Sequence, residues 1–389
     1  MSAAIRAGYK QTEVGVIPGD WEVQRIGDLA TVRSGGTPSR EIQAYWNGDI
    51  PWITTSQIDF NTISEADQFI TEDGLKNSAA KLLPAGTLLM ALYGQGKTRG
   101  KVGVLDFEAA TNQACASINL HGNVSREFLL HFLTSRYEAI RNSSNSGGQE
   151  NLSGQIVKDI PVAIPPIPEQ RAIAAALSDV DALLGGLDRL IAKKRDLKQA
   201  AMQQLLTGQT RLPGFSGEWV ERLLGDIAPL QRGFDLPNSQ LKRGPYPVVY
   251  SNGIGNHHVA FQVKGPGVVT GRSGTIGAVT YVEKDFWPHN TSLWVKAFKD
   301  NDAKFVFYLY TRIGLERFAT GSGVPTLNRN DVHMFKMRIP ASKAEQTAIA
   351  TLLSDMDAEL AALEARRDKT RALKQGMMQA LLTGRIRLI

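Results

Sequence analysis

The sequence predicts an α+β protein in which two β-rich domains alternate with two long helices, and the helices pair as an antiparallel coiled coil. The first observation is a gapless repeat, because the segment from Glu169 to Leu212 recurs from Glu345 to Leu388, 176 positions later (345 − 169 = 176). The second is a seven-residue apolar pattern within each copy. The third is the Gly-rich sequence between the copies, typical of short strands joined by turns. Such a duplicated chain is expected to have pseudo-two-fold symmetry and a ligand with two halves.

Four segments follow from these patterns. They are a first β-rich domain at residues 1–167, a first helix at 168–212, a second β-rich domain at 213–341 and a second helix at 342–389. Apolar runs predict strands at residues 86–93 and 102–107 of the first domain. Each domain is also expected to contain one shorter helix, near residues 126–140 in the first and 303–318 in the second.

Each long helix is marked by its ends and by an apolar seam. Prolines up to Pro168 end the β pattern, Gly208 suits a helix C-terminus, and Ser342 with Glu345 has the spacing of a capping box. Residues 169–207 contain no proline and would extend about 60 Å as a helix. The positions expected to pair the helices are Ile173, Leu177, Val180, Leu184, Leu187, Ile191, Ile349, Leu353, Met356, Leu360 and Leu363. Pairing is favoured because a single-striped helix is unstable alone; a core helix inside each domain is the alternative.

Composition indicates a globular protein, and its positive net charge suits a polyanionic partner. Its 389 residues carry a net charge of +6 and a pI of about 9.3. Residues 1–168 hold 14 Lys/Arg and 17 Asp/Glu, so the first domain can bind nucleic acid only through local basic loops and base contacts. Cys115 is the single cysteine, which excludes an internal disulfide. With no apolar stretch long enough for a membrane span or signal peptide, a cytoplasmic location is expected.

One segment resembles a phosphate-binding loop. Residues 91–98 read Ala-Leu-Tyr-Gly-Gln-Gly-Lys-Thr, a relaxed form of that motif. A phosphate loop must lead into a helix whose amides bind the phosphates, whereas residues 99–104 read as turn and strand. A nucleotide-binding enzyme that uses Gly94 to Thr98 therefore stays an alternative, and a glycine-rich basic loop against a nucleic-acid backbone is favoured.

Motifs for other chemistry are missing from the sequence. The adjacent pair His257-His258 has no cysteine or carboxylate at metal-ligand spacing, so no metal site is predicted. Nucleophile elbows, paired catalytic carboxylates and a methyltransferase-like cofactor loop are not found either. In a duplicated chain linked by coiled-coil helices, this favours a non-catalytic binding protein without a cofactor of its own.

Several segments carry a resemblance to a known family. Residues 9–23 look like the N-terminus common among specificity subunits of type I restriction–modification systems. The loop at residues 35–40 with residues 45–53 resembles the start of that family's target-recognition domains. The Pro-Glu-Gln segment at 168–170 and the Leu-Leu-Thr-Gly segments at 205–208 and 381–384 resemble its conserved helices. The second domain departs from the pattern, since residues 231–234 read Gln-Arg-Gly-Phe in place of the Gly-Gly-Thr-Pro loop.

The resemblance implies a specific function and specific partners. Each domain would read one half of a bipartite site in double-stranded DNA, and the helices would set the spacing and dock two methyltransferase subunits. Those subunits would bind S-adenosylmethionine, and restriction or translocase subunits using ATP and Mg²⁺ are further partners that it allows. A coiled-coil adaptor that does not bind DNA is the remaining alternative.

Residue types suited to base edges and phosphates mark the candidate contacts, because Arg reads guanine, Asn and Gln read adenine, and Lys binds phosphate. In the first domain they are Arg33, Thr37, Ser39, Arg40, Thr54, Thr55, Ser56, Gln57, Tyr93, Gln95, Lys97, Arg99, Lys101, Gln149 and Asn151. In the second domain they are Arg232, Tyr250, Ser251, Asn252, Arg272, Ser273, Thr275, Asn290, Thr291, Asn328 and Arg329.

Overall fold

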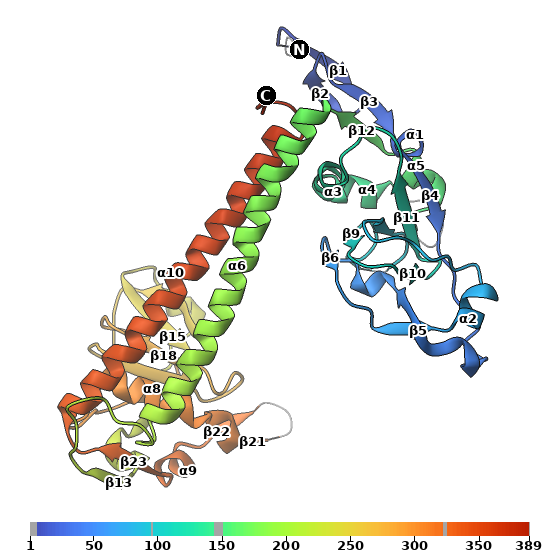
Figure 1. Cartoon of the computed structure of the whole chain (residues 1–389). Helices are drawn as coiled ribbons and strands as arrows, with labels where there is room; N and C mark the ends of the chain where they lie inside the picture. The colour runs from blue at the N-terminus through green and yellow to red at the C-terminus, as the bar shows by residue number, and fades with distance from the viewer. Residues whose placement is uncertain (1–5, 95, 144–150, 322–324, 389) are drawn as a thin grey trace. The chain divides into compact units, whose positions relative to one another are not determined.

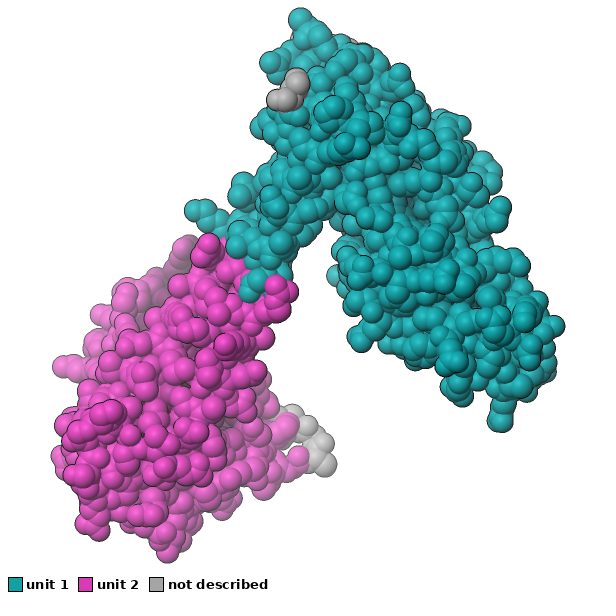
Figure 2. All heavy atoms as spheres, viewed as in Figure 1, with its two compact units in different colours: residues 1–186, 367–389 teal, residues 187–366 magenta. Residues whose placement is uncertain are grey.

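The computed structural model describes residues 6–94, 96–143, 151–321 and 325–388. The chain forms two compact units, unit 1 from residues 1–186 with 367–389 and unit 2 from residues 187–366 (Figure 2). Each unit joins one mixed domain, rich in strands, to part of two long helices (Figure 1). We call residues 1–167 domain 1 and residues 213–341 domain 2. The predicted α+β class, with two long helices, is confirmed.

The long helices are α6 (Ile167–Leu205) and α10 (Lys343–Leu381), and they run antiparallel within each unit. In unit 1 Asp181 of α6 pairs with Lys374 of α10 at 2.5 Å, and in unit 2 Lys194 pairs with Glu359 at 2.7 Å. Residue numbers therefore rise along α6 while they fall along α10. Proline is tolerated in the first helical turn, so Pro168 fits the observed start of α6 at Ile167.

The seam residues are all buried or half-buried. Ile173 and Leu177 belong to the core of unit 1, where they meet Leu381 and Leu382, and Ile349 and Leu353 belong to the core of unit 2. These early seam positions thus pack against the domain as well as against the other helix. The seam assignment is a helix-pairing prediction that variants have still to test.

Domain 1 contains a five-stranded sheet with the order β4-β11-β8-β9-β6 and a three-stranded sheet with the order β10-β5-β7. The β1–β2 hairpin and the β3–β12 pair complete it. Its strands are β1 (Tyr9–Thr12), β2 (Gly15–Pro18), β3 (Glu22–Arg25), β4 (Ala30–Ser34), β5 (Trp46–Ile53), β6 (Thr62–Ile63), β7 (Gln68–Ile70), β8 (Leu88–Ala91), β9 (Val102–Leu105), β10 (Ala110–Thr111), β11 (Cys115–Leu120) and β12 (Pro161–Ile164). Its helices are α1 (Ile26–Leu29), α2 (Glu72–Lys76), α3 (Arg126–Ser135), α4 (Tyr137–Asn142) and α5 (Gly154–Lys158).

Domain 2 repeats the central part of this arrangement with the orders β14-β20-β17-β18 and β16-β15-β19, and with the pairs β13–β23 and β21–β22. Its strands are β13 (Trp219–Leu223), β14 (Leu230–Arg232), β15 (Tyr246–Tyr250), β16 (Gly253–His258), β17 (Gly267–Gly271), β18 (Val279–Val282), β19 (Trp287–Pro288), β20 (Ser292–Val295), β21 (Ala319–Thr320), β22 (Thr326–Leu327) and β23 (Lys336–Pro340). Its helices are α7 (Leu224–Ile227), α8 (Ala303–Ile313) and α9 (Arg329–His333).

Each of the two shorter helices is interrupted within the range that the sequence pattern predicts. The helix expected at residues 126–140 is divided into α3 and α4 at Arg136, whose guanidinium donates to the carbonyl of Val14 at 2.8 Å. The helix expected at 303–318 ends at Ile313 because Gly314 adopts a left-handed conformation with φ of 67°. A 3-10 turn follows it.

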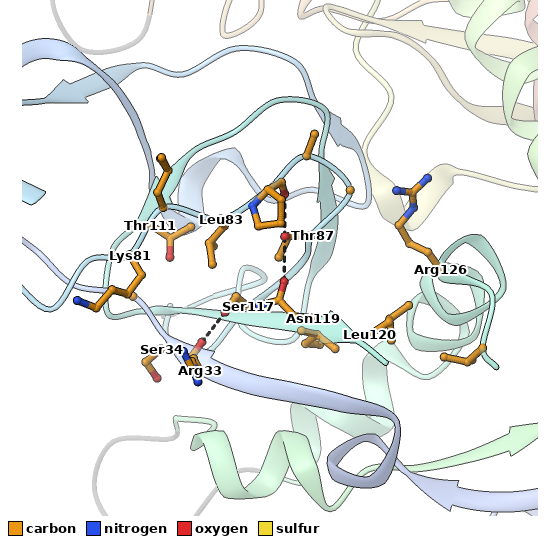
Figure 3. Close-up of a pocket in the computed structure, with 17 residues that line it drawn as sticks. Arg33, Ser34, Lys81, Leu83, Thr87, Thr111, Ser117, Asn119, Leu120 and Arg126 are labelled. Carbon is orange, nitrogen blue, oxygen red and sulfur yellow. Dashed lines mark hydrogen bonds between the residues drawn. The ribbon is translucent and has the colours of Figure 1, made fainter. Parts of the chain in front are cut away.

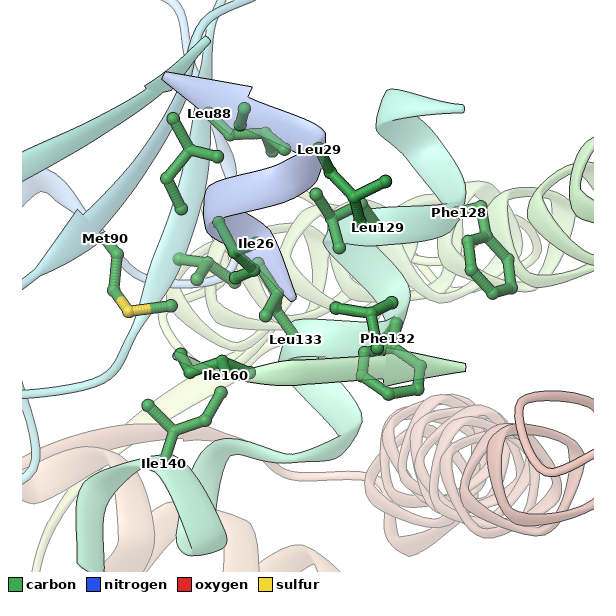
Figure 4. Close-up of a cluster of buried hydrophobic side chains, with 14 of the residues drawn as sticks. Ile26, Leu29, Leu88, Met90, Phe128, Leu129, Phe132, Leu133, Ile140 and Ile160 are labelled. Atoms are coloured by element: carbon green, nitrogen blue, oxygen red, sulfur yellow. The ribbon is translucent and has the colours of Figure 1, made fainter. Parts of the chain in front are cut away.

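The core of unit 1 lies between the main sheet, α3 and the long helices. Apolar side chains from α1, β8 and α3 converge there, as Figure 4 shows for Ile26, Leu29, Leu88, Met90, Phe128, Leu129, Phe132 and Leu133. The core of unit 2 is built in the same way from β17, β20 and α8 against α6 and α10. None of the described helices is both long and apolar enough to cross a membrane.

The segment after each long helix folds back onto a tryptophan. Gly384 follows α10 with φ of 67°, and a Cβ there would lie 2.4 Å from the ring of Pro18 and 3.2 Å from Trp21. Gly208 follows α6 with φ of 74°, and a Cβ would lie 3.1 Å from the ring of Trp219. The repeated Leu-Leu-Thr-Gly sequence is therefore required by a tight turn under an aromatic ring.

This turn brings an arginine to a buried carboxylate in each unit. Arg387 donates to Glu169 at 2.6 and 2.8 Å, and Trp21 Nε1 donates to the same carboxylate at 3.0 Å. In unit 2 Arg211 donates to Glu345 at 2.5 and 2.7 Å, and Trp219 Nε1 is 3.3 Å from it. The expected capping-box role of Glu345 is thus wrong, because its carboxylate is bound to side chains of another segment.

A buried histidine makes the stability of unit 1 dependent on pH. His131 on α3 is 5% exposed, and burial, with a smaller contribution from Lys374, lowers its pKa from 6.5 to about 4. Asp181 and Glu127 oppose that shift. Above pH 6.5 His131 is neutral in both the folded and the unfolded chain. As the pH falls from 6.5 to 4 only the unfolded chain gains the proton, so unit 1 loses stability.

We expect the loss to reach about 3 kcal/mol near pH 4. The measurement is the free energy of unfolding of unit 1 against pH, compared with His131→Gln, which has a polar side chain that does not titrate. The difference between the two proteins should change between pH 6.5 and 4 and be constant above pH 7. A difference that is independent of pH would contradict the assignment.

Candidate nucleic-acid interface

The predicted contact loops gather at one edge of the main sheet in each unit. Neighbouring strands of β4-β11-β8-β9 are antiparallel, so β4 and β8 end at the edge where β11 and β9 begin. The same holds for β14 and β17 with β20 and β18 in domain 2. Loop edge 1 comprises residues 34–41, 54–57, 92–94, 96–101 and 112–115. Loop edge 2 comprises residues 232–235, 250–252, 271–278 and 289–292.

Arg40 is a cation of loop edge 1 whose side chain is held by two neighbours. Its guanidinium lies 4.0 Å from the centre of the Trp46 ring and donates to Gln68 Oε1 at 2.9 Å. Ser39 contributes its carbonyl, which accepts from Trp46 Nε1 at 3.0 Å, and Thr37 donates to Gln113. Stacking on an aromatic face restrains the guanidinium without neutralising its charge. The side chain of Arg40 is therefore restrained while its charge is retained.

Two of the basic side chains in the loop between β8 and β9 are held within the fold. Lys101 pairs with Asp59 at 2.6 Å, and Arg99 is only 5% exposed. Lys97 and Tyr93 are exposed, and the carbonyl of Lys97 accepts from Tyr137 at 2.5 Å. Turns at residues 96–100 lead directly into β9, so no helix follows the Gly-Lys-Thr sequence. The phosphate-loop geometry required by the nucleotide-binding alternative is not formed in this described segment.

Other predicted residues of domain 1 lie at or beside the same edge. Thr54 and Ser56 share a hydrogen bond of 2.7 Å in a 3-10 turn that includes Thr55, and Gln57 donates to the carbonyl of Glu65. Asn151 is next to Leu152, whose amide donates to the carbonyl of Leu92 at 2.9 Å. Gln95 and Gln149 lie outside the described residues.

Arg33 faces a pocket beside loop edge 1. It lies on β4, not on the Gly-rich loop, and it lines a pocket of about 600 Å³ with Lys81 and Arg126 (Figure 3). Thr87 donates to Asn119 at 3.0 Å along one wall. Arg33 and Arg40 are thus held by different parts of the domain.

The backbone of loop edge 2 is fixed by contacts between distant segments. The amides of Arg272 and Ser273 donate to the carbonyl of Thr291 at 2.8 and 3.2 Å, and the carbonyl of Arg272 accepts from Leu327 at 2.7 Å. Among the described side chains, no carboxylate forms an ion pair with Arg272. Its charge remains available to a ligand. Thr275 is exposed further along the same loop.

His289 lies on loop edge 2, although it was not among the contacts predicted from the sequence. Its ring packs 4.5 Å from that of Tyr250, and its Nδ1 is 3.0 Å from the hydroxyl of Thr291. Burial lowers its pKa below the usual value, which favours the neutral ring. Its position directly before Asn290 and Thr291 was the only signal in the sequence.

Three of the remaining candidates of domain 2 have side-chain partners within the fold, namely Arg232, Asn290 and Asn328. Arg232 pairs with Asp235 at 3.2 Å, and Asn290 donates to the same carboxylate. The side chain of Asn328 accepts from the amide of Asn330 at 3.0 Å and caps α9, which begins at Arg329. Ser251 and Asn252 form the turn between β15 and β16. No group of three or more metal-binding side chains occurs in the described part of the chain.

Comparison with known families gives a direct match. The family model described as the type I restriction modification DNA specificity domain matches residues 18–192 and again residues 216–371. The two matches fall on the two domains, each with the long helix that follows it.

Relatives described as type I restriction enzyme specificity subunits are 23–27% identical to this chain over the aligned residues. The type I restriction enzyme MjaIX specificity subunit of Methanocaldococcus jannaschii is 27% identical over 60% of this chain, a match that spans only 57% of that relative. The EcoR124I/EcoR124II specificity subunit of Escherichia coli is 24% identical over 49% of this chain and 48% of its own length. The putative MjaX specificity subunit is 23% identical over 98% of this chain and 97% of its own.

Solved structures show the same fold. The S subunit of the type I restriction–modification system from M. genitalium superposes with a TM-score of 0.65 at 17% identity, over 93% of this chain and 96% of that one. A chain from a study of complex assembly and conformational transition of a type I R-M system gives 0.60 at 15% identity, over 95% and 99%.

Proposed function

The chain belongs to the type I restriction modification DNA specificity family, and we propose that it reads a bipartite site in double-stranded DNA with one domain for each half. The observation that supports this most is that equivalent sheet edges carry different side chains. Loop edge 1 presents a stacked arginine, Arg40, whereas loop edge 2 presents Arg272 beside His289 and Tyr250. Equivalent sheet edges with different chemistry suit the reading of two different base sequences.

The helices would dock two methyltransferase subunits and separate the two readers. Their sequences, identical at more than half of the aligned positions, contrast with the diverged domains and favour a shared docking role. The methyltransferase subunits would bind S-adenosylmethionine, and any restriction subunits would use ATP and Mg²⁺. The chain itself would be non-catalytic and act in the cytoplasm with its DNA.

The test has two stages. Methylation mapping of host DNA with and without this gene should reveal a split sequence that loses its methylation when the gene is absent. That sequence is then titrated at fixed salt with the complex of this chain and its methyltransferase. We expect Arg272→Ala to weaken specific binding by about 1–3 kcal/mol, the range for a bidentate base contact.

Arg222→Ala provides the control, since Arg222 is an exposed arginine on β13, away from loop edge 2. Equal binding by Arg272→Ala and the wild type at the same salt concentration would remove Arg272 from the interface. Methylation patterns that do not depend on the gene would overturn the proposed function.

A further inference from the structure

The same polar junction occurs twice on the long helices. In unit 1 it consists of Ser178 and Asp181 on α6 with Lys374 on α10. In unit 2 it consists of Ser354 and Asp357 on α10 with Lys198 on α6. The three positions are related by the repeat itself (354 − 178, 357 − 181 and 374 − 198 each equal 176).

Each junction receives one buried side chain from its own domain. In unit 1 this is His131 of α3, whose Nε2 is 3.2 Å from Ser178 Oγ and whose Nδ1 is 3.9 Å from Asp181. In unit 2 it is Tyr308 of α8, whose hydroxyl donates to Asp357 at 2.7 Å and is 3.2 Å from Ser354 Oγ. His131 is 5% exposed and Tyr308 is 2% exposed.

We propose that these junctions are positioning devices that fix the register and angle of each domain on the helix pair. At the start of the long helix the domain is anchored by hydrogen bonds, as where Trp21 Nε1 donates to Glu169 and the amide of Ser125 donates to Gln170. Beyond this first anchor the contacts are largely apolar, as with Ile173 and Leu177 against the core of domain 1. Apolar contact is non-directional and tolerates sliding or rotation, whereas a hydrogen bond to a charged group is directional. A domain that turned about this first anchor would keep apolar contacts but would lose its junction.

The two devices differ in strength. Tyr308 forms a hydrogen bond to a carboxylate, and Lys198, which pairs with the same carboxylate, also lies 5.6 Å from the centre of the Tyr308 ring. His131 contacts a hydroxyl, and its distance from Asp181 exceeds that of a hydrogen bond. A pocket of about 630 Å³ lies beside His131, Ser178 and Asp181. Domain 2 is therefore the more rigidly held reader.

Only the consequence of the junctions for DNA recognition rests on the proposed function. If each domain reads half of a DNA site, a domain held in one position on the helices accepts one separation between the half-sites. The junctions would then contribute to spacer specificity without touching DNA.

The first measurement does not depend on DNA. Spin labels at Ser239→Cys and Ala361→Cys, both exposed positions of unit 2, report the distance from domain 2 to α10. Labels at Ser64→Cys and Ala372→Cys do so for unit 1. Cys115 is buried, which raises its pKa to about 12, so it should not react with the label.

We expect Tyr308→Phe to broaden the distance distribution of unit 2 and to raise the population of displaced conformers about tenfold, as loss of a hydrogen bond to a charge implies. His131→Phe should have a smaller effect of the same kind in unit 1. Tyr281→Phe is the matched control, since the Tyr281 ring packs on Phe307 and its hydroxyl makes no hydrogen bond among the described residues. Distributions unchanged by Tyr308→Phe would overturn the proposal.

The second measurement is methylation mapping with the same variants. Tyr308→Phe should leave both half-site sequences unchanged while sites with a spacer one base pair longer or shorter gain methylation. Strict retention of the spacer together with unchanged distances would reject the device. Failure of the wild type to direct any bipartite methylation would instead reject the proposed function, and the distance measurement would still decide the role of the junctions.

Discussion

Replacement of Arg211 by alanine should lower the free energy of unfolding of unit 2 by about 3–5 kcal/mol, because it leaves a buried carboxylate without its cation. Glu345 is 1% exposed and receives two hydrogen bonds from Arg211. After the substitution its only remaining side-chain donor among the described residues is Trp219 Nε1 at 3.3 Å. Arg387→Ala should have the equivalent effect in unit 1, where Glu169 is 3% exposed.

The effect can be separated from ordinary loss of a surface ion pair. Arg195→Ala, which removes the exposed pair with Glu364, should cost less than about 1 kcal/mol. The double variant Arg211→Ala with Glu345→Gln should recover part of the loss, because it removes the buried charge. Hydrogen exchange of amides in the core of unit 2 is the measurement. Equal losses of unfolding free energy for Arg211→Ala and Arg195→Ala would show that the buried pair contributes no more to stability than an exposed ion pair.

Exchange of residues 213–340 for the corresponding domain of another family member should replace one half of the methylated sequence and retain the other. Loop edge 2 is built entirely from residues within this range, and β13 pairs with β23 at its two ends. The exchange therefore moves a complete reader and leaves loop edge 1 untouched. The change should be close to all-or-none, since each mismatched base pair costs about 1–3 kcal/mol.

The design must preserve the contact between the domain and the helices. Arg211 and Glu345 lie outside the exchanged range, so a donor domain should carry a tryptophan at the position of Trp219. The reciprocal exchange of residues 1–165 is the control, and it should change only the other half. Alteration of both halves by either exchange would contradict independent reading.

The long helices could be predicted closely because their signals are local. A proline-free heptad pattern predicted a helix at 169–207, and α6 occupies Ile167–Leu205. The strand predicted at 102–107 appears as β9, Val102–Leu105. Gly314 could also have been recognised as a helix end from its type alone. The division of α3 from α4 could not, because Arg136 is held by a carbonyl 122 residues earlier in the chain.

The sequence predicted where the candidate loops lie, but it could not predict the partners of their side chains. Each set of loops lies at one edge of its own sheet, but Lys101 is paired with Asp59 and Arg232 with Asp235. Residue type shows that a side chain can bind a phosphate, not whether a carboxylate already neutralises it. Which individual residues contact DNA stays a prediction.

The sequence by itself determined the duplication, the two long helices and the family. Repeats, heptads and motifs can be read directly from the order of residues along the chain. Only the tertiary structure decided what the polar residues of those helices do. Lys198 lies seven residues beyond Ile191, the last seam residue of α6, and it pairs with Asp357 across the helix pair. Glu169 and Arg387 are 218 residues apart in the chain and in contact in the fold. Such pairs depend on the folded path of the chain, for which no local pattern carries a signal.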